Sequence, residues 1–262
     1  MGVVNTDEWL KKETNPLKIC GKLKGHFQGL HVEDIHQYLS QFGMYKSVSK
    51  SYIQKMLKRN VWERVKKHYQ YLNTKWAGPD IPIYIFPVNE SNGFLSRNFG
   101  GRSGVSFPDK LFLFLSYEVD EEELKSVLTH EYHHICRISK YEKKEENYTL
   151  LDTIILEGLA EHAVGEMLGE QALTFWVKKY SPSQLNRWWN LWIKPHQEVT
   201  RDDPKYIQLL YGMSFYPKML GYAIGYHIVR TYDKKHKMTI KDSFTISVER
   251  LVAFYEKEII NN

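Results

Sequence analysis

Two histidines four residues apart enclose a glutamate in the middle of this chain, and this pattern restricts the structure around it strongly. His130, Glu131 and His134 form the pattern H-E-x-x-H. On an α-helix, residues four apart are separated by only about 40° around the axis, so both imidazoles can reach one metal ion. Glu131 lies beside them, where its carboxylate can take a proton from a metal-activated water. The pattern therefore predicts a helix that carries a pair of zinc ligands and a general base.

The surroundings of the motif favour a buried site over an exposed one. The apolar side of the predicted helix 121–137 is formed by Leu124, Val127, Leu128 and Ile135. Glu131 falls within this side, and His130 and His134 lie at its border. A buried carboxylate between two imidazoles needs a strong partner, and a metal ion is one. His133 is predicted on a polar flank and is not expected to be a ligand, although a His130/His133 pair stays open.

A catalytic zinc site needs a third protein ligand and one position for water. The next predicted helix, 150–168, places Glu157 and Glu161 beside its apolar stripe. We expect Glu157 to be the third ligand of Zn²⁺. Glu161, one turn later, is expected to accept a hydrogen bond from the N–H of a ligand histidine. A solvated position is the alternative for each glutamate.

These segments resemble the gluzincin metallopeptidases, whose third ligand is a glutamate on a helix after the H-E-x-x-H helix. More narrowly, the chain resembles the DUF2268 (YjaZ-like) family of predicted Zn-dependent proteases. The resemblance rests on T-H-E-x-x-H at 129–134, E-G-L-A-E-H at 157–162 and G-Y-x-x-G-Y at 221–226, and it covers about residues 81–232. It implies a zincin-type core, bound Zn²⁺ and hydrolysis of peptide bonds. Leu156 stands where aminopeptidases of this type carry asparagine, so recognition of a free amino terminus is not implied.

A peptidase also needs a donor for the oxyanion that develops on the peptide carbonyl. Tyr222 and Gly225 resemble the Y-x-x-G pattern of gluzincin aminopeptidases, which implies Tyr222 as this donor. Tyr226 and His227 are the alternatives. Core packing is a further interpretation, because aromatic residues four apart on a helix often pack on each other.

Two further sequence features have alternative interpretations. The segment Gly100–Val105 is either a sheet edge that pairs with an extended substrate, with its adjoining loop, or a flexible hairpin loop. Cys136 is predicted to project away from the metal and to be a small packing residue. Cys20 and Cys136 are the only cysteines, which excludes a disulfide framework.

The order of predicted elements indicates the fold class. Strands are predicted at 83–86, 105–107 and 111–115, and helices at 32–46, 50–76, 121–137, 150–168, 172–180, 183–193, 204–211, 214–233 and 245–259. We predict an α+β, mainly helical fold with a gluzincin-like zincin core: a small antiparallel or mixed sheet, an active-site helix and a helical C-terminal part. Pro79 and Pro82 suggest a boundary between an N-terminal helical region, 1–78, and a zincin-like metallopeptidase domain, 79–262.

The composition argues against several classes of protein for this chain. Hydrophobic residues make up 42% and charged residues 26%, as in globular chains. The net charge of +5 is spread along the chain, which argues against nucleic-acid binding; a basic helix at Lys50–Lys75 is the weaker alternative. No secretory signal and no apolar stretch of about 20 residues is present, so we expect a cytoplasmic protein without a membrane span. The sequence carries no signal of oligomeric state.

Together these features predict a zinc metallopeptidase, a hydrolase that acts on a peptide or protein substrate with Glu131 as general base. The alternative is a catalytically silent zinc-binding interaction or chaperone-like protein that keeps a peptidase scaffold. A purely structural zinc site has no need of Glu131, which favours catalysis. Cleavage preference, endo- or exopeptidase action and the role of the N-terminal helices are not specified by the sequence.

Overall fold

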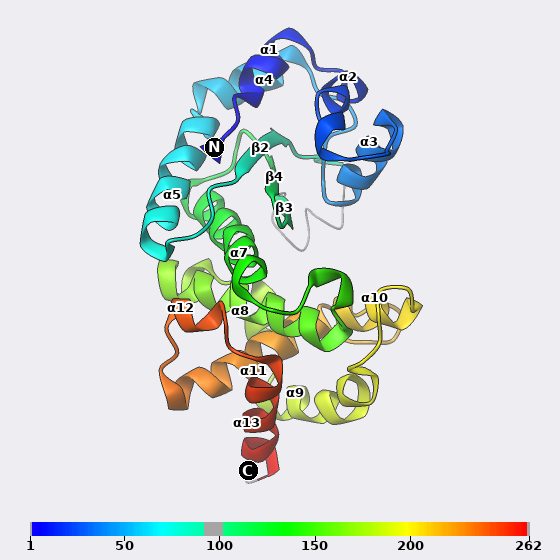
Figure 1. Cartoon of the computed structure of the whole chain (residues 1–262), viewed down its shortest axis with the longest axis vertical. Helices are drawn as coiled ribbons and strands as arrows, with labels where there is room; N and C mark the ends of the chain where they lie inside the picture. The colour runs from blue at the N-terminus through cyan, green and yellow to red at the C-terminus, as the bar shows by residue number, and fades with distance from the viewer. Residues whose placement is uncertain (1, 92–101, 261–262) are drawn as a thin grey trace. The chain divides into compact units, whose positions relative to one another are not determined.

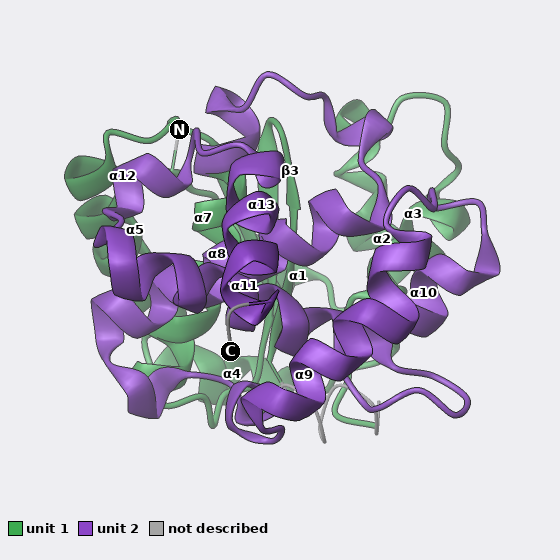
Figure 2. Cartoon of the chain, turned by 90° about the horizontal axis from the view of Figure 1, so that it is seen from below, with its two compact units in different colours: residues 1–135 green, residues 136–262 purple. Residues whose placement is uncertain are grey.

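The computed structural model describes residues 2–91 and 102–260, and its elements are labelled in Figure 1. The chain divides into two compact units, Met1–Ile135 (unit 1) and Cys136–Asn262 (unit 2), shown in two colours in Figure 2. The division falls inside helix α7 (Glu121–Lys140). Helices dominate and the sheet is small and mixed, which confirms the predicted α+β, mainly helical class. Over the described residues, no helix combines the length and the apolar character needed to cross a bilayer.

Unit 1 contains a four-stranded sheet and most of the N-terminal helices. Its strands are β1 (Gly2–Val3), β2 (Pro82–Pro87), β3 (Ser103–Phe107) and β4 (Lys110–Leu115), in the order β1-β2-β4-β3. Its other described elements are α1 (Thr6–Lys12), α2 (Pro16–Gly21), the 3₁₀ turn η1 (Lys24–His26), α3 (Val32–Gln41), α4 (Lys50–Lys58) and α5 (Val61–Trp76), followed by most of α7. The strands predicted from the sequence are therefore confirmed as β2, β3 and β4.

The two central strands of the sheet are buried along almost their whole length. All residues of β4 and all but the first of β2 are buried, as expected for the short apolar runs that they form in the sequence. Strands β1, β2 and β4 run parallel, whereas β3 pairs antiparallel with β4, with Gly104 opposite Leu113 and Ser106 opposite Leu111. Strand β3 lies at one edge of the sheet, and β1 lies at the other.

The N-terminal segment is tied directly to this sheet. Strand β1 pairs with β2, and the hydroxyl of Thr6 donates to the carbonyl of Ile85 at 2.6 Å. The indole N–H of Trp62 in turn donates to Thr6 Oγ1 at 2.8 Å. Residues on both sides of the predicted 78/79 boundary thus belong to one compact unit, and the start of a catalytic domain at residue 79 stays a prediction.

Unit 2 is helical and is built around α8 (Leu150–Leu168) and α11 (Leu220–His236). Its remaining helices are α9 (Pro182–Trp188), α10 (Pro204–Tyr211), α12 (Ile240–Ser243) and α13 (Val248–Ile260), with the shorter turns η2 (Glu145–Asn147), η3 (Glu170–Ala172), η4 (Phe175–Lys178), η5 (Trp189–Ile193) and η6 (Lys194–His196). Helix α8 is capped by Thr149, whose hydroxyl accepts from the N–H of Asp152. It is buried over most of its circumference, as expected of a central helix.

Glycines allow α8 and α11 to meet backbone against backbone. A Cβ on Gly225 would lie 2.0 Å from the carbonyl oxygen of Ile154, and a Cβ on Gly158 would lie 2.3 Å from the carbonyl carbon of Gly225. Neither backbone atom can move without shifting its helix. Glycine at these two positions is therefore required for the observed helix separation.

Four predicted helices differ from the structure. The stretch 32–46 is helical only to Gln41, where α3 ends. The stretch 50–76 is two helices, because Asn60 adopts a left-handed backbone conformation (φ 52°) that asparagine tolerates better than most residues. Residues 172–180 contain only the short turns η3 and η4, since Gly169 ends α8 with a positive φ and the chain continues in single turns. The helix predicted from 214 begins only at Leu220, because Ser214 and Met219 have positive φ.

Substitution of Gly225 by alanine tests the contact between α8 and α11. Alanine gains up to about 1 kcal/mol over glycine from helix propensity, so any loss must come from the clash with Ile154. We expect Gly225→Ala to lower the free energy of unfolding by about 3 kcal/mol in urea denaturation. Gly25→Ala is the control, because a Cβ there meets no atom within 4 Å. Equal stability of the two variants would contradict the contact.

A buried histidine in unit 1 makes stability depend on pH. His68 of α5 lies with Nε2 2.9 Å from Thr129 Oγ1, and burial, helped by the charge of Lys125, lowers its pKa to about 4 from 6.5. The unfolded chain binds this proton at higher pH than the folded chain does. The unfolding free energy should therefore fall as the pH drops from 6.5 towards 4, by about 3 kcal/mol for a shift of this size. Urea denaturation across this range should show a weaker fall for His68→Gln, with exposed His236→Gln as the control.

Candidate metal centre

Helix α7 presents two imidazoles to the same point in space. It begins with a capping pair, in which the Asp120 side chain accepts from Glu123 N at 2.7 Å, and it continues unbroken to Lys140. The rings of His130 and His134 lie 4.7 Å apart between centroids, and a ligand nitrogen of one lies within 4.8 Å of a ligand nitrogen of the other. His134 is buried and His130 is half-buried. The pair can therefore bind one cation that approaches from the open side of His130.

Strand β3 holds the carboxylate between these histidines. Ser106 Oγ lies 2.6 Å from Glu131 Oε2 and 2.9 Å from the carbonyl oxygen of Glu131, as a donor to both. A Cβ on Gly104 would lie 2.5 Å from Glu131 Cγ. Residues two apart in a strand point to the same face, so Gly104 makes room for the glutamate and Ser106 anchors it. The sequence gives no motif for Ser106, because only the register of β3 brings it to Glu131.

Helix α5 covers the other side of the motif. His133 is fully buried, and its ring packs edge-on against Trp76 at 6.1 Å between centroids. The prediction of a polar flank at His133 is therefore wrong. Tyr132 stacks on the same Trp76 at 5.8 Å, and its hydroxyl donates to the carbonyl of Pro79 at 3.0 Å. The flank is buried because α5, far away in the sequence, packs across α7.

Unit 2 contains a cluster of side chains around Glu157. Burial and the negative charge of Glu157 raise the pKa of Tyr211, while a hydrogen bond with Tyr222 acts in the opposite direction. The rings of Tyr211 and Tyr222 lie 5.8 Å apart, and Tyr222 also packs edge-on against Trp176 at 5.5 Å. Glu157, Tyr211 and Tyr222 thus form one group on α8, α10 and α11. Tyr211 was not identified from the sequence, because nothing near it resembles a motif.

Glu161 follows Glu157 by one turn of α8 and is almost fully buried, with 3% of its surface exposed. Its Oε1 accepts hydrogen bonds from both the N–H and the hydroxyl of Thr174, at 2.6 Å each. Thr174 therefore fixes the orientation of this carboxylate. The predicted hydrogen bond from a ligand histidine to Glu161 stays a prediction.

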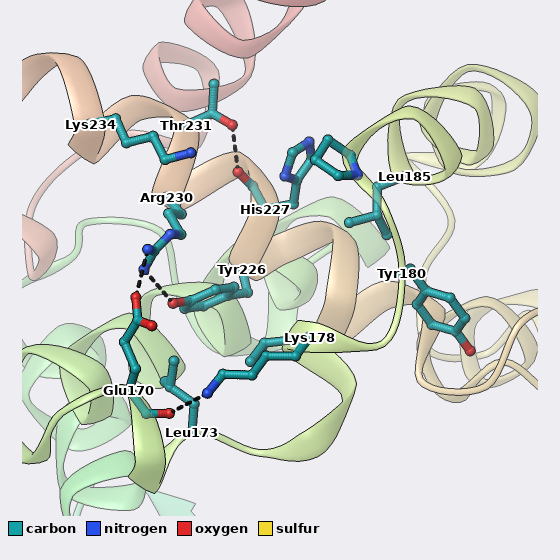
Figure 3. A pocket seen from close by; sticks show the side chains of 12 residues that line it. Glu170, Leu173, Lys178, Tyr180, Leu185, Tyr226, His227, Arg230, Thr231 and Lys234 are labelled. Carbon is teal, nitrogen blue, oxygen red and sulfur yellow. Dashed lines mark hydrogen bonds and ion pairs between the residues drawn. The ribbon is translucent and has the colours of Figure 1, made fainter.

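The two alternative oxyanion donors, Tyr226 and His227, line a cavity of about 230 Å³ within unit 2 (Figure 3). The hydroxyl of Tyr226 accepts from Arg230 at 3.1 Å, and Arg230 also pairs with Glu170 at 2.7 Å. His227 Nε2 lies 3.0 Å from Asn186 Oδ1, and burial, together with the charge of Lys234, lowers the pKa of His227 to about 4. Both side chains thus have hydrogen-bond partners of their own, whereas Tyr222 belongs to the group that contains Glu157.

The two cysteines and the glycine-rich segment before the motif were also considered in the sequence. Cys136 and Cys20 are buried and are not joined in a disulfide, which agrees with packing roles. Gly100 and Gly101 lie outside the described residues. From Arg102 onwards the chain is described, and Ser103 begins the edge strand β3, so pairing of an extended substrate with this edge stays a prediction.

The sequence matches a family of known proteins. Residues 61–253 match the family described as "Predicted Zn-dependent protease (DUF2268)". The chain belongs to this family. It is 38% identical to "Uncharacterized protein YjaZ" of Bacillus subtilis (strain 168) over 254 residues, covering 95% of this chain and 97% of that protein. It is 28% identical to "Uncharacterized protein YjfC" of the same strain over 186 residues, covering 65% and 59% of the two chains. No solved structure matches.

The contact between β3 and Glu131 can be tested by filling the space at Gly104. In Gly104→Ala the Glu131 side chain must leave its position, because the new Cβ would overlap its Cγ and Cδ. A flexible side chain can move at low cost, so we expect less than about 1 kcal/mol loss of unfolding free energy and a rotated Glu131 carboxylate in a crystal structure. An unchanged Glu131 rotamer would contradict the contact; Gly25→Ala again serves as the stability control.

Proposed function

We propose that this protein is a zinc-dependent peptidase in which His130, His134 and Glu157 bind Zn²⁺ and Glu131 is the general base. The metal dependence and protease activity agree with the description of the DUF2268 family. The substrate is a peptide or a protein.

The donor set suits zinc. Two imidazoles and one carboxylate are the ligands of many catalytic zinc sites, which leave one position for water. The ring arrangement of His130 and His134 supports a shared ion. Glu157 belongs to unit 2, and its joining of the two histidines is part of the proposal; the E-G-L-A-E-H segment and its distance along the chain support it.

The position of Glu131 is the observation that carries the proposal of catalysis. A zinc site that only stabilises a fold does not need a carboxylate next to two histidine ligands. Here that carboxylate is half-buried, anchored by Ser106, and given space by the glycine at position 104. Two of the five residues of β3 orient this one glutamate. A role of Glu131 as general base explains this arrangement better than packing does.

The residues of the chain divide the reaction between them. When bound, Zn²⁺ supplies a Lewis acid and lowers the pKa of water. Glu131 takes the proton of the attacking water and then delivers it to the leaving nitrogen. Tyr222 donates its hydroxyl to the oxyanion, and Tyr211 positions Tyr222 through their hydrogen bond. The edge strand β3 offers backbone groups to an extended peptide, so that its scissile bond comes to lie near Glu131.

Glu131→Gln is the variant that separates catalysis from metal binding. The amide keeps the size of the side chain and can still accept from Ser106, but it cannot take a proton. We expect cleavage of a peptide library to fall by about 10²- to 10⁴-fold while the zinc content stays the same. Metal analysis and cleavage are measured on the same preparations.

Glu122→Gln, an exposed change in the first turn of α7, is the matched control and should behave as wild type. His134→Ala should lose both zinc and cleavage. If Glu131→Gln keeps wild-type cleavage, the proposed base is wrong. If wild type binds zinc but cleaves no peptide, the chain is the zinc-binding interaction protein named as the alternative.

A further inference from the structure

Unit 2 contains a second group of metal-ligating side chains, separate from the residues used above. His162 and Glu166 lie four residues apart on α8, and Asp233 lies on α11. Each of the three offers a ligand atom within 4.8 Å of the ligand atoms of the other two. On α8, the i and i+4 spacing places His162 and Glu166 on the same face, as in the ligand pair of α7.

The distance between His162 and Asp233 fits a shared ion better than a direct bond. His162 Nε2 lies 3.4 Å from Asp233 Oδ2. Charge-assisted hydrogen bonds of this type are about 2.7–2.9 Å long. Two ligand atoms on one tetrahedral zinc ion, with bonds of about 2.0–2.2 Å, lie roughly 3.3–3.5 Å apart. A small cation between these two atoms therefore needs almost no rearrangement of them.

The aspartate is oriented as a metal ligand usually is. Its other oxygen, Oδ1, accepts a hydrogen bond from the backbone N–H of Met238 at 2.9 Å. This N–H is available because Lys237 ends α11 in a left-handed conformation. The hydrogen bond fixes the carboxylate plane and leaves Oδ2 directed at His162, which is how outer partners orient the ligands of metal sites.

Burial and charge at this group also favour a cation. His162 is only 4% exposed, Asp233 is partly exposed and Glu166 is exposed, so the group has a buried end and an open end. In the described part of the chain, neither carboxylate forms an ion pair with a lysine or an arginine. Two carboxylates beside one buried imidazole leave a negative charge that a divalent ion can neutralise.

We propose that His162, Glu166 and Asp233 bind a second divalent transition-metal ion, with Zn²⁺ as the best fit to one nitrogen and two carboxylate donors. Solvent completes the coordination at the open end. The ion links α8 to α11, the two helices that carry Glu157 and Tyr222. Its role is to stabilise this helix pair, and its binding does not depend on the proposed peptidase activity.

Glu166→Gln tests the second site without disturbing the core, because Glu166 is exposed and forms no ion pair in the described chain. A purely structural pair of His162 and Asp233 predicts no effect of this change. The proposal predicts zinc affinity at the site at least about tenfold lower. The exposed helical Glu63→Gln is the matched control.

The two metal sites can be counted separately by combining variants. After saturation with zinc and removal of loosely held ions by gel filtration, wild type should hold about two zinc ions per chain, and His134→Ala and Glu166→Gln about one each. The double variant His134→Ala/Glu166→Gln should hold none. Added zinc should raise the melting temperature of His134→Ala but not that of the double variant.

The outcomes also keep the two proposals apart. If Glu166→Gln retains as much zinc as wild type, with the same affinity in calorimetric titration, the second site is wrong. If His134→Ala retains all of its zinc while Glu166→Gln loses one ion, the second site is supported and the proposed catalytic ligands are wrong.

Discussion

Helices α8 and α11 approach so closely that a Cβ on Gly225 would lie 2.0 Å from the carbonyl oxygen of Ile154. The proposed metal ligands of unit 2 and the proposed oxyanion donor Tyr222 all lie on this pair of helices. Glu157 directly precedes Gly158 at the contact, and Tyr222 lies one turn before Gly225. A bulkier residue at the contact would push the helices apart and separate the groups that they carry.

In unit 1 a glycine likewise allows a close approach, here between a strand and a helix. Gly104 and Ser106 face Glu131 from alternate positions of β3: the glycine has no side chain to displace the glutamate, and the serine supplies a hydroxyl 2.6 Å from it. The space at Gly104 and the hydrogen bond from Ser106 together fix the Glu131 carboxylate. In both units, therefore, a glycine lies beside a candidate functional glutamate. At Gly104 the space is filled by the Glu131 side chain, and at Gly158 it is filled by the backbone of α11.

Much of this arrangement was predictable from local patterns. The strands β2, β3 and β4 and the bounds of α8 and α10 follow from apolar runs, helical periodicity and turn residues. The predicted helices were wrong where the backbone conformation of one residue ends a helix that its neighbours favour. Asn60 is an example, because its left-handed backbone divides a stretch with continuous helical composition. The buried position of His133 was not predicted, because a helical projection contains only the residues of one helix and Trp76 belongs to another.

The sequence by itself determined how the proposed ligand pair and its proposed base lie relative to one another, since helical geometry fixes the relation of His130, Glu131 and His134 within little more than one turn. It also identified the family, through segments that need no structure to be compared. Only the tertiary structure decided which partners these residues meet: Ser106 at Glu131, Tyr211 at Tyr222, and Asp233 at His162. Those contacts join residues far apart in the chain, and they depend on strand register and helix packing, which no local periodicity encodes.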